Sequence, residues 1–146
     1  MFLIKMVFGG EYRIPEKPQR KDFLWNSPFL NPSMMFRAAV LKNINGFKVS
    51  TENKRAEDYD LFFRLYAKGY KGYNIQRKLF NYRIEIEDEK NKKYRPMKDR
   101  INEAKVRIKG FKMLHMSIRG IPFVIKPVLI GLIPHQIFYK IRRKQY

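Results

Sequence analysis

Residues 56–65 (AEDYDLFFRL) constrain the fold of this chain more than any other segment. The segment begins with three carboxylates, at Glu57, Asp58 and Asp60, and continues with aromatic and aliphatic side chains. Carboxylates are favoured in the first turn of a helix because the free backbone N–H groups and the helix dipole stabilise them. A Lys-Gly pair at 68–69 supplies a typical C-terminal end. The pattern therefore predicts an amphipathic helix with an acidic beginning.

Other segments predict short strands and further helices. Residues 22–25 predict a single helical turn, and residues 37–43 predict a short helix that stops at Gly46. Strand composition, bounded by glycine, proline or basic turns, is found in four places, at residues 2–8, 32–36, 73–75 and 79–83.

Residues 96–146 predict a helical extension. Pro96 opens a long helix, and its expected apolar face is formed by Ile101, Ala104, Ile108, Phe111 and Leu114. Residues 121–134 are apolar but contain three prolines, and they are shorter than the roughly 20 residues that a membrane-spanning helix needs. A final basic helix is expected over residues 135–144. We therefore divide the chain into a first region, residues 1–95, and a C-terminal extension, residues 96–146.

Charge is the second constraint. The chain has 146 residues, enough for one domain, and its 32 basic and 13 acidic residues give a net charge of +19. Residues 107–146 hold nine of the basic residues and no acid. Such a surface attracts nucleic acid or the anionic face of a membrane, and the apolar content of the same region favours the membrane. The sequence contains no cysteine, which excludes disulfides and cysteine chemistry within it, and its two histidines leave little for zinc.

Two motifs resemble a known enzyme family. Residues 31–37 (NPSMMFR) and the acidic segment are similar to the hPSxMFR and EDYDLxxR motifs of the family 2 inverting glycosyltransferases, which use nucleotide-sugars and have a GT-A fold. Residues 69–75 (GYKGYNI) and 79–83 (LFNYR) resemble the same family, so that the resemblance covers about residues 7–145. It implies an α/β fold: the acceptor-side, C-terminal half of a GT-A nucleotide-diphospho-sugar transferase domain, followed by the helical basic tail.

The resemblance also implies site residues. Asp58 corresponds to the general base of the family, which takes the proton of the acceptor hydroxyl as that oxygen attacks the anomeric carbon. Substrate-binding positions on the acceptor side are implied for five residues, Glu57, Ser33, Met34, Arg37 and Arg64.

Some of these positions have plainer interpretations. A helix start favours carboxylates without any catalysis, Arg64 is equally expected as an ion-paired surface arginine, and Met34 suits a core. Asp58 and Asp60 point about 200° apart on a helix, so they are not expected to hold a metal together. Trp25 is an aromatic on which a sugar ring can stack, although most aromatics lie in a core.

The family's nucleotide-binding half and its Asp-x-Asp metal loop have no counterpart in this sequence. We therefore expect no cofactor bound by this chain, a divalent metal (Mg²⁺ or Mn²⁺) in full-length relatives, and no transferase activity of the chain alone. The complete enzyme is expected to use a nucleotide-sugar and a glycan or lipid-linked acceptor in surface polysaccharide assembly. Its N-terminal half is either missing through a truncated or misannotated gene or supplied by a separate chain, unless this chain is an accessory paralogue. It would be cytoplasmic and peripheral on the inner face of the cell membrane, on anionic lipid.

A second function class competes with this interpretation. Tyr70, Tyr73 and Tyr94 lie among lysines and arginines, as in proteins that stack single-stranded nucleic acid on aromatic side chains. The alternative is therefore a non-catalytic basic module that binds nucleic acid. For the transferase interpretation no specific nucleic acid binding is expected beyond weak, salt-sensitive attraction.

Overall fold

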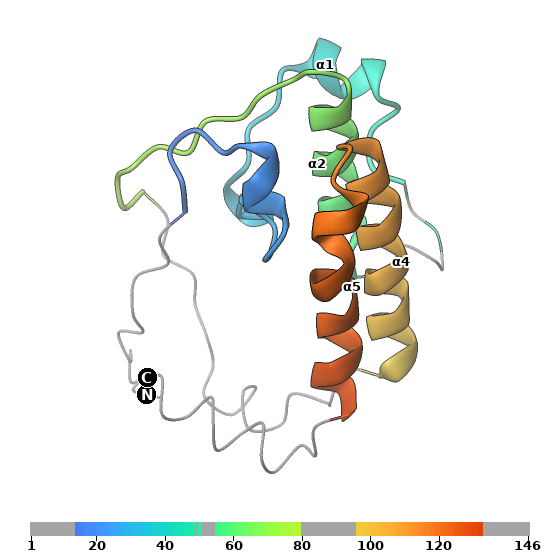
Figure 1. Cartoon of the computed structure of the whole chain (residues 1–146). Helices are drawn as coiled ribbons and strands as arrows, with labels where there is room; N and C mark the ends of the chain where they lie inside the picture. Colours follow the sequence, from blue (N-terminus) through green and yellow to red (C-terminus); the bar gives the residue numbers. More distant parts are fainter. Residues whose placement is uncertain (1–13, 49, 51–54, 80–95, 133–146) are drawn as a thin grey trace, which may run out of the picture.

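The structure, a computed structural model, describes residues 14–48, 50, 55–79 and 96–132. Its elements follow in the order η1 Arg20–Phe23, η2 Asn31–Ser33, α1 Ala38–Asn43, α2 Glu57–Ala67, α4 Met97–Met113 and α5 Ser117–Leu132. Helices α2, α4 and α5 lie side by side, with the 3-10 helix η1 beside α2 and α1 at one end (Figure 1). Helix α4 packs against both α2 and α5.

The predicted α/β fold is wrong for the residues that the structure describes. Every regular element in them is helical, and none is a strand. Within residues 32–36, Pro32 stands in the first turn of η2 and the Ser33 N–H bonds back to Leu30 O at 3.0 Å, so this segment turns instead of pairing. The GT-A half that the resemblance implied is therefore not what the described chain forms.

The predicted strand over residues 73–75 also fails for a local reason. The Asn74 N–H donates to Glu16 O at 2.8 Å, which brings the segment beside residues 15–18. Those residues include Pro15 and Pro18, and proline has no N–H to give to a ladder. The Asn74 side chain holds the segment instead, by donating to Pro15 O at 2.7 Å and Pro28 O at 3.0 Å. The strand predicted over residues 2–8 lies outside the described residues, and so does the strand predicted over residues 79–83 apart from Leu79.

The helices predicted within the first region, and the long helix predicted after Pro96, are confirmed. Helix α1 corresponds to the helix predicted at 37–43, and η1 overlaps the helical turn predicted at 22–25. The acidic segment forms α2, and Gly69, with φ of 84°, ends it in the left-handed region that favours glycine. The predicted helix after Pro96 is α4, with Pro96 as its N-cap.

The face that α4 buries includes Ala104, Phe111 and Leu114, as predicted, but not the two isoleucines. Ile101 and Ile108 are 43% and 54% exposed, whereas Arg100 and Arg107 are buried. The inward face is therefore offset by one residue from the expected isoleucine stripe. Arginine can occupy such a face because its aliphatic stem packs while its head group finds acceptors.

The core is built from aromatic rings around α2. Phe62 and Phe63 are fully buried, and Phe63 lies 5.2 Å from the Phe23 ring of η1 and 5.6 Å from the Phe111 ring of α4. A Cβ atom at Gly110 would come within 2.2 Å of Phe63, so glycine lets α4 approach α2 closely. Both η1 and α4 thus pack against α2.

Helix α5 crosses a segment that the sequence analysis left irregular. It continues through Pro122 and Pro127, although each proline removes one internal hydrogen bond. Gly120 and Gly131 seat α5 on α4, since a Cβ atom there would meet Phe111 at 2.3 Å and Arg100 at 2.5 Å. Within the described part of the chain, none of the helices has the length and apolarity that crossing a bilayer requires.

Candidate functional site

The carboxylate of Asp58 lies in the first turn of α2 beside a small cavity. The residue is half-buried, and its Oδ1 accepts the N–H of Tyr59 at 2.7 Å. The cavity has a volume of about 150 Å³ and is lined by Asn26, Ser27, Arg55, Ala56, Asp58, Tyr59 and Glu103. Three separate parts of the chain, the loop after η1, the start of α2 and α4, therefore converge on the predicted base.

Tyr59 fixes the start of α2 in the core. Its hydroxyl donates to Phe23 O, and its ring stacks on the Phe23 ring at 6.2 Å between centroids. Burial raises the pKa of Tyr59 well above its ordinary value, with the Arg107 cation opposing the rise. Because Tyr59 follows Asp58 directly, its anchoring also limits where the Asp58 carboxylate can lie.

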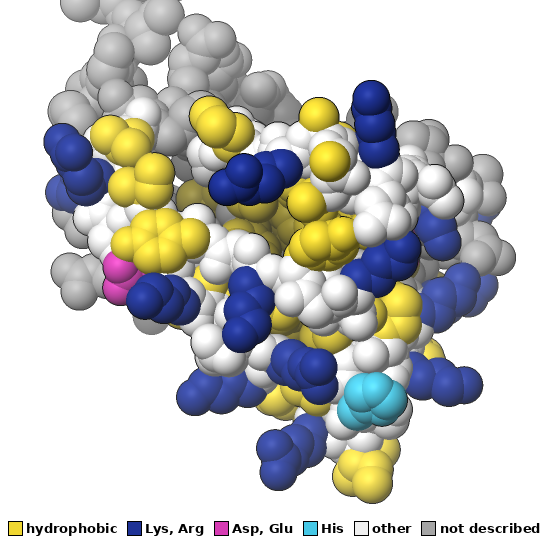
Figure 2. Space-filling model, turned by 90° about the horizontal axis from the view of Figure 1, so that it is seen from above, with side chains coloured by type: hydrophobic (Ala, Val, Ile, Leu, Met, Phe, Trp, Pro, Cys, Tyr) yellow, Lys and Arg dark blue, Asp and Glu magenta, His cyan; other side chains and the backbone are white. Residues whose placement is uncertain are grey.

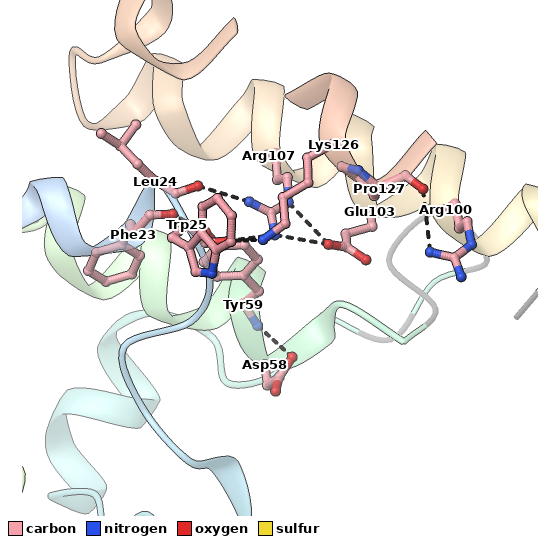
Figure 3. A network of polar contacts seen from close by, with 10 residues as sticks. All are labelled: Phe23, Leu24, Trp25, Asp58, Tyr59, Arg100, Glu103, Arg107, Lys126 and Pro127. Atoms are coloured by element: carbon pink, nitrogen blue, oxygen red, sulfur yellow. Dashed lines mark hydrogen bonds and ion pairs between the residues drawn. The ribbon is translucent and has the colours of Figure 1, made fainter. Parts of the chain in front are cut away.

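Arg107 of α4 joins the elements on the other side of the cavity (Figure 3). Its guanidinium bonds to Glu103 Oε1 at 3.1 and 3.0 Å, to Leu24 O at 3.1 Å and to Trp25 O at 3.3 Å. The same guanidinium lies 5.1 Å from the centroid of the Tyr59 ring, a cation–π distance. Arg107 thus holds α4, the loop after η1 and α2 together around the cavity.

Arg55 makes a further link at the rim. Its Nε lies 3.4 Å from Asp99 Oδ2 of α4, and its backbone φ is 64°. A positive φ is uncommon for a residue other than glycine, so the chain turns sharply just before α2 begins. The cavity therefore has a cationic side chain on its edge next to the carboxylate of Asp58.

Trp25 lies beside the cavity residue Asn26 and is 66% exposed. The Lys126 Nζ of α5 lies 3.4 Å from the Trp25 ring centroid and donates to Trp25 O at 3.2 Å. Phe123 meets the same ring edge-on at 6.2 Å. Burial, followed by the nearby Arg107 cation, lowers the pKa of Lys126. The Trp25 ring is therefore exposed, and the ammonium group of Lys126 lies over one of its faces.

Of the predicted substrate-binding residues, Glu57 lies nearest to Asp58. It is half-buried, and among the described residues its Oε2 has no hydrogen-bond partner. Ser33 is exposed and donates to Leu30 O at 3.0 Å, while Arg37 is exposed at the N-cap of α1. Met34 packs against the core, as its plainer interpretation predicted. None of Ser33, Met34 and Arg37 lines the cavity beside Asp58.

Arg64 is held by three acceptors. Its Nε bonds to Asp60 Oδ2 at 2.8 Å, and its two terminal nitrogens bond to Ile44 O at 2.6 Å and Gly46 O at 2.7 Å. The side chain is only 10% exposed. These contacts tie α2 to the loop after α1, which favours the ion-paired interpretation of Arg64 over substrate binding.

The described residues contain no group of three or more His, Asp or Glu side chains that is arranged to hold a metal ion. Asp58 and Asp60 face different surroundings, the cavity and Arg64, as helical geometry predicts for residues two apart.

Several residues of the site were missed by the sequence analysis. Arg55, Glu103 and Arg107 were not singled out, and neither was Lys126. One local signal was present, because Glu103 and Arg107 are four apart with the acid first, which is the favourable order for an ion pair on a helix. The contacts of Arg107 with Leu24 and Trp25 span more than 80 residues of sequence and left no local pattern.

Comparison with known proteins found a distant relative. The chain is 24% identical over 136 residues to the putative glycosyltransferase EpsE of Bacillus subtilis (strain 168), and the match covers 93% of this chain and 48% of EpsE. The chain thus spans about half the length of that relative. No family model and no solved structure matches the chain. The relationship supports a glycosyltransferase-like function and does not favour the nucleic acid alternative.

Proposed function

We propose that this chain supplies the acceptor-activating part of an inverting, nucleotide-sugar-dependent glycosyltransferase, with Asp58 as the general base. The relationship to EpsE supports the transferase class. The observation that carries the residue assignment is the half-buried Asp58 carboxylate at the head of α2, beside a cavity to which three parts of the chain contribute.

The proposed step is a single displacement. The acceptor hydroxyl gives its proton to the Asp58 carboxylate while its oxygen forms a bond to the anomeric carbon of the donor. The bond from that carbon to the diphosphate breaks, and the nucleoside diphosphate leaves with the electron pair. A carboxylate suffices as base because the hydroxyl becomes acidic only as the new bond forms, and such a base contributes about 10² to 10⁴ in rate.

The surroundings of Asp58 suit this role. The Tyr59 N–H holds Oδ1, and the anchored Tyr59 ring keeps the first turn of α2 in place. A positioned base needs such support, because small displacements of a reacting group reduce rates strongly. Trp25 precedes the cavity residue Asn26 in the chain, and its exposed ring is the surface on which we place the ring of the acceptor sugar.

Complete relatives are expected to hold the donor diphosphate with Mg²⁺ or Mn²⁺. The described residues of this chain offer no fitting set of ligands, so no step is assigned to a metal here. We propose that the other half of the complete enzyme binds the donor, and we expect the chain alone to release no nucleoside diphosphate from nucleotide-sugars.

The test is a hybrid protein in which this chain replaces the matched segment of EpsE. Release of nucleoside diphosphate is measured with a panel of nucleotide-sugars and glycan acceptors, for the hybrid and for the chain alone. We expect turnover by the hybrid, and we expect Asp58→Asn to lower kcat by about 10² to 10⁴. Circular dichroism confirms that each variant is folded.

Glu16→Gln is the matched control, because it makes the same acid-to-amide change at an exposed carboxylate whose contact is with Tyr73, away from the cavity. This control should retain the rate of the parent hybrid. A folded Asp58→Asn hybrid with an undiminished kcat would refute Asp58 as the base. If EpsE is active under the same conditions and the hybrid is not, the transferase assignment is contradicted.

A further inference from the structure

Helix α5 carries a second apolar face that no described residue covers. Five large aliphatic residues on it are between 46% and 84% exposed, namely Ile118, Ile121, Ile125, Leu129 and Leu132. Their spacing of three, four, four and three residues places them on one stripe about 80° wide. The stripe lies about 140° around the helix from Gly120, Pro127 and Gly131, the buried residues of α5. We call these five residues the α5 stripe.

An exposed stripe of this size is unusual for a helix that already buries its other face. A soluble helix normally presents polar side chains to water, and contiguous exposed apolar residues mark a surface for another molecule. The stripe also runs the whole length of α5, from its first turn to its last. Among the described residues, α4 covers one face of α5, and the α5 stripe is open to a further partner.

Charge indicates the nature of that partner. Residues 107–132 contain five Lys or Arg and no acid, and Lys109, Lys112 and Arg119 among them are exposed. Figure 2 shows the end of the molecule with α1 and the turn between α4 and α5, where Lys and Arg side chains surround hydrophobic ones and acidic side chains are scarce. An aliphatic stripe beside cations is the composition of helices that lie in the interface of anionic lipid.

Other occupants fit less well. A second copy would have to bring two chains of net charge +19 together at a basic face, which electrostatic repulsion opposes. Nucleic acid bases stack on aromatic rings, and the stripe is aliphatic throughout.

We propose that α5 lies flat on an anionic membrane surface, with the α5 stripe in the acyl boundary and Lys109, Lys112 and Arg119 toward the lipid head groups. Such a contact differs from crossing the bilayer, because it needs only one apolar face. The long stems of lysine and arginine allow their charges to reach head groups from the sides of the helix. The proposal does not depend on the transferase assignment, since the stripe shares no residue with the cavity beside Asp58.

The test uses the full chain and vesicles of equal parts phosphatidylglycerol and phosphatidylcholine, with partitioning measured by flotation. The triple variant Ile121→Gln/Ile125→Gln/Leu129→Gln should lower the partition coefficient by about 1,000-fold, at roughly tenfold for each aliphatic side chain lost from the boundary. The matched control, Met35→Gln/Ile75→Gln/Leu79→Gln, changes three exposed apolar residues elsewhere and should stay within about threefold of the parent.

A depth measurement separates insertion from simple charge attraction. The chain has no cysteine, so Ile125→Cys provides a single position for an environment-sensitive dye. That dye should report an apolar surrounding on anionic vesicles, while the same dye at Ile75→Cys should remain in water. Raising the salt from about 0.1 to 1 M should weaken binding, because the Debye length falls from roughly 10 to 3 Å.

Three results would overturn the proposal. The first is unchanged binding by the stripe variant, and the second is a water-exposed dye at position 125 on bound protein, which would assign binding to charge alone. The third is a dimer in light scattering that the stripe variant dissociates, because the occupant would then be a second copy. Equal binding to neutral phosphatidylcholine vesicles at high salt would remove the role of the basic residues.

Discussion

Replacing Arg107 by alanine removes the group that joins α4, the loop after η1 and the ring of Tyr59. The guanidinium is 2% exposed and bonds to Glu103 Oε1, Leu24 O and Trp25 O. Without it, a largely buried carboxylate and two backbone carbonyls each lose the hydrogen bonds that the guanidinium donates. The structure therefore predicts a loss of stability well beyond that of an ordinary surface ion pair.

The magnitude follows from the burial of the pair. An exposed ion pair contributes about 0 to 1 kcal/mol, whereas removing one partner of a buried pair costs about 3 to 5 kcal/mol because the other charge stays unpaired. The side chain of Glu103 is 16% exposed, so we expect about 3 kcal/mol for Arg107→Ala, the lower end of that range. Since small domains have a free energy of unfolding of roughly 5 to 15 kcal/mol, this loss is large.

A double variant tests whether the loss of the Arg107–Glu103 ion pair is the cause. Arg107→Met keeps an unbranched stem over Tyr59 but takes the guanidinium away from Glu103, whereas Arg107→Met/Glu103→Met removes both charges. We expect the double variant to be more stable than Arg107→Met alone, by about 1 kcal/mol or more. The order would be reversed if Glu103 were well solvated without Arg107.

Urea unfolding provides the assay, followed by far-ultraviolet circular dichroism and by the fluorescence of Trp25, the one tryptophan of the chain. Arg119→Ala is the control, because Arg119 is an exposed arginine of α5 and its loss should change the free energy of unfolding by at most about 0.5 kcal/mol. If Arg107→Ala unfolds within about 1 kcal/mol of the parent, the bonds around Arg107 do not hold the elements together and the reasoning fails.

Two further predictions concern α2. Arg64→Lys replaces a planar fork that reaches Asp60, Ile44 O and Gly46 O by a single amine, and should cost about 1 to 3 kcal/mol in urea unfolding, whereas Arg77→Lys at an exposed position should cost almost nothing. Burial raises the pKa of Tyr59 above its ordinary 10.0, so the unfolded chain releases this proton first. The contribution of Tyr59 to stability is therefore complete below about pH 10 and declines as the pH rises above it, and Tyr59→Phe should make the decline shallower in urea midpoints taken from about pH 8 to 11. Parallel declines for parent and variant would contradict the burial of that hydroxyl.

Local signals predicted the helices well. The carboxylates before an aromatic run gave α2, Gly69 marked its end, and Pro96 marked the beginning of α4. These signals work because caps and first turns are decided by neighbouring residues. The position of Asp58 at a helix start was predictable for the same reason, and its role as base remains a prediction.

Features that depend on distant residues were not predictable in this way. The strand expected at residues 73–75 would have needed a partner with free N–H groups, and the segment beside it contains Pro15 and Pro18. The predicted buried face of α4 was right at Ala104, Phe111 and Leu114. It left out Arg107, because this residue is polar in the sequence but satisfied in the fold by carbonyls more than 80 residues away. Helix α5 was missed because Pro122 and Pro127 usually end helices, whereas packing against α4 maintains this one.

Helix α2 contributes both to the core and to the proposed site, so substitutions in the core should also affect the site. One turn of α2 contains Asp58, which lines the cavity, and Phe62, which is fully buried four residues later. Tyr59, between them, is bonded to Phe23 O of η1 and lies beneath Arg107 of α4. A change in any of these contacts moves the first turn of α2, because neighbouring residues on a helix are rigidly linked. Core substitutions around Tyr59 should therefore reduce turnover of the hybrid enzyme more than its stability loss predicts, whereas Arg64→Lys, at the other end of α2, should affect stability alone.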